Sequence, residues 1–228
     1  SILLKLLSGY ENPDYGQVFI HGLDMEKRRK ETRKLIGYVP EGSPLYNEMT
    51  TLDFLTFICD VRKVNKNLEL AKIIKLLNLN DVLLQKIETL SKGFKRRVGL
   101  AQALIHDPEV LILDEPTDGL DPNQKNEVRN LIKKLGKEKA IIISTHILEE
   151  VNAICNRAMI IDNGKLLLDD KPKEILKKSE SYNSIYLSVE EKNSAELKKE
   201  ILDKKISKDV TIANNYCVIK TNNSKFIK

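Results

Sequence analysis

The sequence contains no tryptophan, and only 5% of its residues are aromatic. Few rings are therefore available to stack on unpaired bases, and we expect no nucleic-acid partner. The three cysteines, Cys59, Cys155 and Cys217, lie far apart in the chain. They match neither a disulfide framework nor the close spacing of a metal site, which favours reduced thiols. No apolar run approaches the roughly twenty residues that a membrane-spanning helix needs.

The sequence is only mildly basic. Its net charge of +5 arises from 38 lysines and arginines against 33 aspartates and glutamates. The basic clusters at residues 27–30 and 95–97 can meet phosphates or anionic lipid headgroups, but a solvated basic face explains them equally well. A length of 228 residues, of which 41% are hydrophobic, fits one large domain or one domain with an appendage.

The stretch Leu90–Asp121 contains most of the candidate functional residues, and it reads LSKGFKRRVGLAQALIHDPEVLILDEPTDGLD. A Ser-Lys-Gly turn opens a helix predicted over Ser91–Ile105. The aliphatic run Val110–Leu113, flanked by prolines, predicts a buried parallel strand. Asp114 and Glu115 follow at its carboxyl end, where open α/β sheets bind their ligands. One such acid can hold Mg²⁺, and the next can orient or deprotonate an attacking water.

A second buried strand, predicted over Ala140–Ser144, is followed by Thr145 and His146. His146 therefore leaves the same edge of the sheet as the two acids. Ser91 is a favourable helix cap, and the amides and positive dipole end of the helix behind it favour an anion. Asp121, which precedes a proline, is likewise a favourable cap for the next helix.

In their order and spacing, these residues resemble the signature loop, the Walker B strand and the D-loop of an ATP-binding cassette (ABC) ATPase. The resemblance covers residues 1–178. It implies an α/β fold, a P-loop NTPase-like ABC cassette with a mostly parallel central sheet and a helical insert at about residues 50–90. Residues 179–228, predicted as strand, helix, strand and strand, resemble a small C-terminal β/α accessory module that is incomplete. A poorly ordered tail is the alternative for this segment.

The resemblance implies roles for four residues at the sheet edge. Asp114 would associate with Mg²⁺, Glu115 would act as the general base, and His146 would form a hydrogen bond with the γ-phosphate of ATP. Glu41 stands where the family usually has the glutamine of the Q-loop. A carboxylate there can bind water, but it adds negative charge near the γ-phosphate unless a metal neutralises it. An ordinary loop acid is the alternative.

The signature loop would bind the γ-phosphate of ATP held by a second cassette, through Ser91, Lys92 and Gly93, with Asp121 of the D-loop at the same dimer seam. The sequence departs from the usual Leu-Ser-Gly-Gly-Gln at two positions, Lys92 and Phe94. Lys92 can contact a phosphate or point to solvent, and the glutamine amide is lost at Phe94. Asp121 can serve as a helix cap alone.

A helix predicted over Ser1–Leu7 ends before Gly9, a residue that tolerates positive φ. The resemblance places Ser1 at the hydroxyl residue that follows the lysine of the phosphate-binding loop, where it would ligate Mg²⁺. We therefore expect the chain to be N-terminally truncated within the Walker A motif, and to bind ATP poorly by itself.

Taken together, these features predict the ATP-hydrolysing subunit of a bacterial ABC-2 type exporter, of the branch that includes multidrug, sodium-export and gliding-motility types. Mg²⁺-ATP would close a homodimer of cassettes that drives a separate integral-membrane permease. The protein would be cytoplasmic and peripheral on the inner face of the plasma membrane. Two alternatives remain open: a soluble ABC ATPase that acts on ribosomes or DNA, and a non-hydrolysing truncated remnant.

Overall fold

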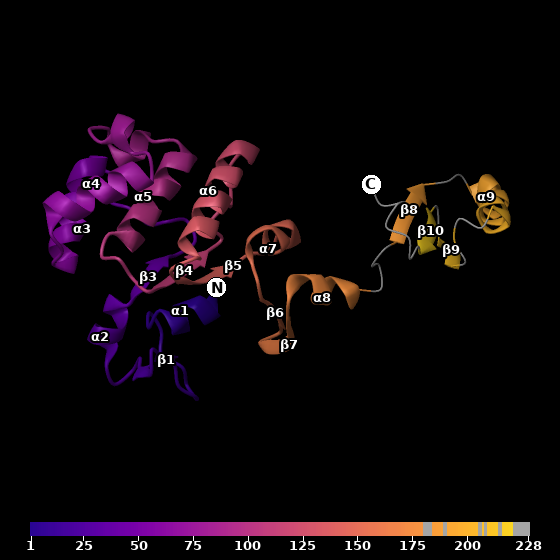
Figure 1. Cartoon of the computed structure of the whole chain (residues 1–228), viewed down its shortest axis with the longest axis horizontal. Helices are drawn as coiled ribbons and strands as arrows, with labels where there is room; N and C mark the ends of the chain where they lie inside the picture. The colour runs from indigo at the N-terminus through magenta and orange to yellow at the C-terminus, as the bar shows by residue number, and fades with distance from the viewer. Residues whose placement is uncertain (180–183, 189–190, 205–206, 208, 214–215, 221–228) are drawn as a thin grey trace. The chain divides into compact units, whose positions relative to one another are not determined.

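The computed structural model describes residues 1–179, 184–188, 191–204, 207, 209–213 and 216–220. It contains two compact units, Ser1–Ile154 and Cys155–Lys228 (Figure 1). The domain boundary expected after residue 178 stays a prediction. None of the helices formed by the described residues combines the length and apolar character required to span a bilayer.

The first unit is organised around a three-stranded parallel sheet in the order β3–β4–β5. These strands are β3 (Ile36–Val39), β4 (Val110–Asp114) and β5 (Ala140–Ser144). Every residue of the central strand β4 is buried, as expected for an aliphatic run between two neighbouring strands. The parallel register pairs Asp114 with Ser144, so the carboxyl ends of β4 and β5 lie side by side. The predicted α/β class with a parallel central sheet is confirmed.

Helices cover both faces of this sheet (Figure 1). Leu111 and Leu113 of β4 belong to a large core formed with α3, α4, α5 (Lys92–Leu104) and α6 (Pro122–Leu135). The alternate residues Val110 and Ile112 belong to a smaller core with α1 (Ile2–Leu7). Helix α5 packs closely on β3 at Gly37, because a Cβ atom there would lie 2.2 Å from the carbonyl oxygen of Ala103.

The helical insert contains α3 (Thr51–Arg62) and α4 (Lys66–Leu76), followed by the 3₁₀ helices η1 (Asn80–Val82) and η2 (Ile87–Thr89). The sequence predicts a cap at Thr50 or Thr51, and the structure assigns it to Thr50, whose side chain accepts a hydrogen bond from the Asp53 amide. The sequence predicts the second helix from about Leu68, but Asn65 caps α4 in the same way, so the helix begins earlier.

The chain between α1 and β3 forms a hairpin of β1 (Phe19–Ile20) and β2 (Leu23–Asp24), followed by α2 (Arg29–Lys34). His21 and Gly22 form its turn with φ values of 50° and 73°, which suits a two-residue hairpin loop. The predicted strand at residues 17–20 is therefore shorter than expected. Gly9 adopts φ 68°, as the helix end requires.

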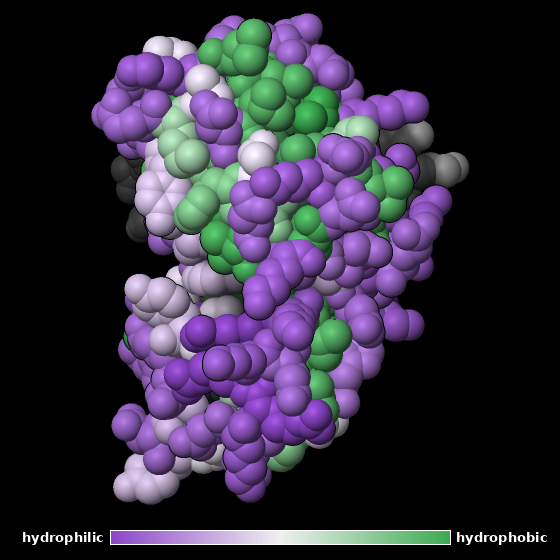
Figure 2. Space-filling model, turned by 90° about the vertical axis from the view of Figure 1, so that its left-hand side faces the viewer, coloured by the Kyte–Doolittle hydropathy of each residue, from purple (hydrophilic) through white to green (hydrophobic). Residues whose placement is uncertain are grey.

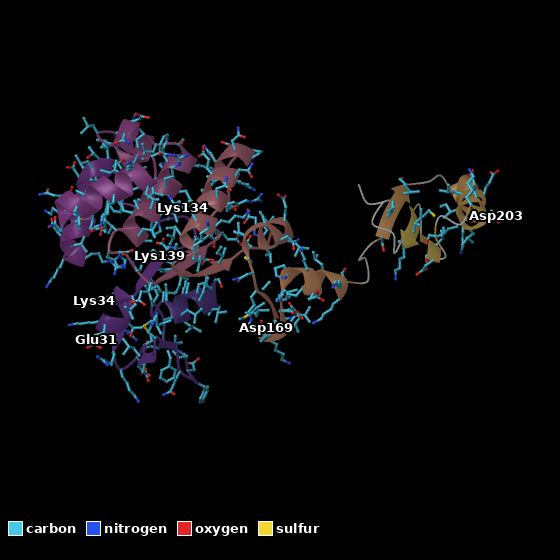
Figure 3. All side chains as sticks on the ribbon, viewed as in Figure 1. Glu31, Lys34, Lys134, Lys139, Asp169 and Asp203 are labelled. Carbon is cyan, nitrogen blue, oxygen red and sulfur yellow. The ribbon has the colours of Figure 1, made fainter. Side chains whose placement is uncertain are left out.

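The last helix of the first unit is α7 (Leu148–Ile154). The second unit begins with a hairpin of β6 (Ala158–Asp162) and β7 (Lys165–Asp170), then α8 (Pro172–Lys177). Asp169 of β7, labelled in Figure 3, accepts hydrogen bonds from Arg157 at 2.7 and 2.8 Å. The turn residues Asn163 and Gly164 both have positive φ, which confirms the predicted hairpin.

A three-stranded antiparallel sheet in the order β8–β10–β9 follows in the second unit. Its elements are β8 (Ser184–Ser188), α9 (Glu191–Asp203), β9 (Asp209–Ala213) and β10 (Tyr216–Lys220). Ile201, Val210, Cys217 and Ile219 form its core. The predicted order of strand, helix, strand and strand is confirmed. The sequence predicts a linker from Ser179, a first strand that ends at Val189 and a helix that ends at Lys205. Of these, residues 180–183, Val189 and Lys205 lie outside the described residues, as does the tail at 222–228.

Candidate functional site

The carboxyl ends of β4 and β5 border a cavity of about 380 Å³. Every residue that lines it has a polar side chain, and four of these residues are acids. The residues are Ser1, Glu41, Asp114, Glu115, Asp118, Ser144, Thr145 and His146. The first helix, the loop after β3 and the loops after β4 and β5 all contribute, because parallel strands bring their carboxyl ends to one edge of the sheet.

Asp114 lies at the end of β4 and is only 3% exposed. One carboxylate oxygen accepts a hydrogen bond from the Ser144 hydroxyl, which the β4–β5 register places alongside it. Ser1, which directly precedes α1, lines the same cavity. The structure therefore brings Ser1 and Asp114 to one cavity, while their role as metal ligands stays a prediction.

Glu115 leaves the strand with φ 48°, a left-handed conformation that is unfavourable for a residue with a side chain. Its backbone nitrogen donates to the Ser144 carbonyl at 3.1 Å, which holds this turn against β5. The Glu115 carboxylate accepts a hydrogen bond from Nδ1 of His146 at 2.9 Å. This hydrogen bond and the charge of Glu115 raise the pKa of His146. The two residues predicted for catalysis are thus in direct contact.

Glu41 reaches the cavity from a tight loop after β3. Gly42 and Ser43 in this loop have φ values of 74° and 43°. The Ser43 hydroxyl accepts a hydrogen bond at 2.9 Å from Arg96 on α5, and the Arg96 side chain is buried. Burial lowers the pKa of Arg96, while Asp118, Glu115, Glu41 and Asp114 oppose that effect. The solvated basic face suggested for residues 95–97 is therefore wrong for Arg96, whose buried guanidinium is acted on by the charges of the four cavity acids.

The remaining predicted residues lie at the starts of α5 and α6 and do not line this cavity. Ser91 caps α5 by accepting from the Phe94 amide at 3.3 Å, and Asp121 caps α6 by accepting from the Gln124 amide at 2.9 Å. The two helix starts are neighbours, because a Cβ atom on Gly93 would lie 2.6 Å from the Gln124 side chain. Lys92 lies beside Gly119 in the same region.

The cavity fits a magnesium-bound nucleotide on its acidic side. Four carboxylates share its lining, and the nearby Arg96 offers only one positive charge against them, so a bound cation is favoured there. Mg²⁺ prefers oxygen ligands and commonly takes only one or two carboxylates from a protein. No group of three acids, histidines or cysteines among the described residues could hold a metal alone. Asp114 and the Ser1 hydroxyl are the donors that suit this limited contribution.

Two buried polar residues of this region escaped the sequence reasoning. Glu150 of α7 is 0% exposed and Thr117 is 1% exposed, and the two form a hydrogen bond. In the sequence, Glu150 belongs to an acidic pair at a helix start, which usually indicates a favourable surface charge. The one signal in the sequence was Thr145, the hydroxyl residue that directly precedes His146. Small polar residues beside a catalytic loop commonly orient that loop.

Comparison with known proteins identifies relatives of this chain. The family model described as ABC transporter matches residues 1–118. The chain is 34% identical to the uncharacterized ABC transporter ATP-binding protein YxlF of Bacillus subtilis, over 83% of this chain and 63% of that protein. It is 34% identical to the bacitracin transport ATP-binding protein BcrA of Bacillus licheniformis, over 83% of this chain and 62% of that protein.

A third relative, the Nod factor export ATP-binding protein I of Rhizobium etli, is 30% identical over 77% of this chain and 57% of that protein. The chain thus spans less than two thirds of the length of these relatives. Among solved structures, cbiO1 from Clostridium perfringens, described as part of the ABC transporter complex cbiONQ, aligns with a TM-score of 0.68 and 27% identity. That alignment covers 78% of this chain and 74% of the other.

Proposed function

Because this chain belongs to the ABC transporter family, whose model matches residues 1–118 of its 228, we propose that the protein is the ATP-binding and ATP-hydrolysing subunit of a bacterial ABC-2 type exporter. The observation that carries the proposal is the meeting of three side chains at one sheet edge. Asp114 and Glu115 are consecutive at the end of β4, and His146, from the loop after the neighbouring strand β5, contacts Glu115 at 2.9 Å.

Five of the eight cavity residues have a part in this proposal. Bound Mg²⁺-ATP would supply the electrophilic terminal phosphate, and its Mg²⁺ would offset the charge of the acids nearest to it. Asp114 and the Ser1 hydroxyl would hold the metal, and Glu41 would orient the attacking water. Glu115 accepts the proton of that water, a contribution typically worth ~10²–10⁴-fold in rate. His146 donates a hydrogen bond to the terminal phosphate. A raised pKa favours this role because a protonated imidazole attracts an anion.

A second copy of the chain completes the site. Ser91, Lys92, Gly93 and Asp121 lie at helix starts that do not line the acidic cavity. The free amides at the start of α5 and its positive dipole end suit a phosphate. In this proposal, these two helix starts contact the nucleotide held by the partner cassette. The active form is then a homodimer.

A separate integral-membrane permease is the second partner. Figure 2 shows apolar residues gathered on the part of one face that α3 and α4 occupy, above a mainly hydrophilic part that includes α2. The exposed apolar side chains there include Phe57 and Val61 of α3 and Leu68 of α4. A permease bound to this surface would hold the protein at the cytoplasmic face of the plasma membrane. The bacitracin-transport and Nod-factor-export names of two relatives support transport, in the second case outward.

The test of this function is the Glu115→Gln variant of the protein as its gene encodes it, purified with its permease. We expect steady-state ATP hydrolysis to fall at least ~100-fold while ATP binding persists, because only the proton acceptor is removed. The matched control is Glu109→Gln, which changes an exposed acid just before the opposite end of β4 and should leave turnover intact. Undiminished hydrolysis by Glu115→Gln would exclude Glu115 as the base. No hydrolysis by the unmodified protein would favour a non-hydrolysing remnant.

A further inference from the structure

Glu150 of α7 is a fully buried carboxylate that none of the proposed catalytic roles explains. Its side chain is 0% exposed, and both of its oxygens are engaged. Oε1 accepts a hydrogen bond from the Thr117 hydroxyl, and Oε2 accepts one from the Thr145 hydroxyl at 3.1 Å. Burying a charged group is unfavourable unless it is well paired, so this position needs a physical reason.

The two threonines come from the two loops that carry the proposed catalytic residues. Thr117 follows Glu115 by two positions in the loop after β4, and Thr145 directly precedes His146 in the loop after β5. The Thr145 hydroxyl also accepts from the Ile147 amide at 3.1 Å, which fixes the start of α7 to the same loop. One carboxylate therefore connects the two loops behind the point where Glu115 and His146 meet.

Simple charge neutralisation explains this arrangement less well. Arg129 of α6 is the basic partner of Glu150, but the closest approach between them is 3.6 Å. The same guanidinium lies closer, at 3.0 Å, to the exposed neighbour Glu149. A buried ion pair also contributes little net stability once its desolvation is included. The hydrogen bonds from the two threonines are shorter than the contact with Arg129. Because a threonine hydroxyl is uncharged, these hydrogen bonds fix the position of the loops and do not neutralise the carboxylate.

We propose that Glu150 is a positioning residue that holds the loops after β4 and β5 in the arrangement where Glu115 faces His146. Its effect on turnover rests on the proposed ATPase function. Its effect on the loops does not, since these contacts are made between residues of this chain alone. Loss of either threonine contact should free both loops while leaving the strands beneath them intact.

The primary test is amide hydrogen exchange of the nucleotide-free protein as its gene encodes it. Thr117→Val removes one hydroxyl and leaves every charge in place, and Glu150→Gln removes the carboxylate. In both variants, exchange at residues 115–120 and 145–147 should rise about tenfold or more, because a buried hydrogen bond is lost. Exchange within β4 should stay unchanged. The control Glu149→Gln, which removes an exposed acid from the same helix, should leave both loops as they are.

A second measurement follows the His146 ring by NMR, which is practical because the chain has three histidines. The charged groups that act on this ring are Glu115, Asp118 and Glu150. Thr117→Val keeps all three, so a fall in the pKa of His146 in this variant would report a displaced ring and not a lost charge. A purely structural role for Glu150 would lower the melting temperature and leave this pKa unchanged.

Three outcomes would overturn the proposal: unchanged exchange in both loops of Thr117→Val, an equal rise in Glu149→Gln, or a uniform rise throughout the first unit. If Glu150→Gln does not fold, the hydrogen exchange of Thr117→Val alone tests the proposal. If the unmodified protein hydrolyses ATP but the variants show no faster exchange in the two loops, only this proposal is refuted. If the variants show the expected faster exchange but the unmodified protein does not hydrolyse ATP, only the proposed function is refuted.

Discussion

Mild acid should destabilise the first unit through one imidazole, that of His106 in the loop between α5 and β4. Its Nε2 donates a hydrogen bond to the carbonyl of Ile36 at 3.0 Å, which joins this loop to the first residue of β3. Its Nδ1 is buried and has no hydrogen-bond partner among the described residues. Burial, and then the nearby charge of Arg62, lower the pKa of His106 to about 4. The fold therefore holds this ring in its neutral form.

The sign and size of the effect follow from this pKa. The folded pKa of about 4 lies below the ordinary 6.5, so the stabilisation is complete above pH 6.5 and is lost as the pH falls towards 4. The pKa difference corresponds to a ceiling of ~3 kcal/mol in the free energy of unfolding, at ~1.4 kcal/mol per pKa unit. Because the ring is only partly buried, solvent screening reduces the expected loss to ~1–2 kcal/mol.

Urea unfolding of the unmodified protein and of His106→Gln, at pH 7.5, 5.5 and 4.5, measures this loss. Carboxylates titrate in both proteins, so the difference between their unfolding free energies isolates the histidine. We expect His106→Gln to be less stable at pH 7.5, where it lacks the contact with Ile36, and the gap to narrow by ~1–2 kcal/mol at pH 4.5. A gap that is the same at all three pH values would refute the reasoning.

Two further predictions concern the site and the packing beneath it. Glu115→Gln should lower the pKa of His146, because the hydrogen bond and charge of Glu115 are the main causes that raise it; an NMR titration in which the pKa stays unchanged would contradict the observed contact. Gly37→Ala should cost ~1–3 kcal/mol in urea unfolding, since its Cβ would lie 2.2 Å from a backbone oxygen of Ala103. In Gly136→Ala the nearest atom is at 3.3 Å, so this control should change stability by less than ~1 kcal/mol.

Local chemistry explains why much of the fold could be predicted from the sequence. The bounds of β5 agree with the prediction, and β4 is longer by one residue, Asp114. Short aliphatic runs such as these favour strands, and the residues around them break regular structure. β4 is buried throughout, as predicted, but β5 was also predicted to be buried, and its Ala140 is exposed while its other residues are half-buried. The caps at Thr50, Ser91 and Asp121 were also predictable, because each depends on a hydrogen bond to an amide three residues away.

What escaped prediction depends on contacts between distant segments. Arg96 lies in a basic run typical of a solvated surface, yet it is buried because the loop after β3 brings Ser43 to it. Glu150 is buried because the loops after β4 and β5 both converge on α7. The sequence predicted only that Glu115 and His146 leave the same edge of the sheet, and not that they are in contact. Their hydrogen bond depends on the left-handed turn at Glu115, which no local pattern announces.

The position of β4 between two separate cores has a consequence for motion at the cavity. Its alternate side chains insert into different hydrophobic clusters, and both of its edges are paired, so no single local opening can expose it. Ligand sites usually belong to the least protected parts of a protein. Here Asp114 lies at the end of β4, whose backbone amides should exchange hydrogen more slowly than any others in the unit. Rearrangement when a ligand enters should therefore fall on the surrounding loops, with Asp114 as the stationary reference point.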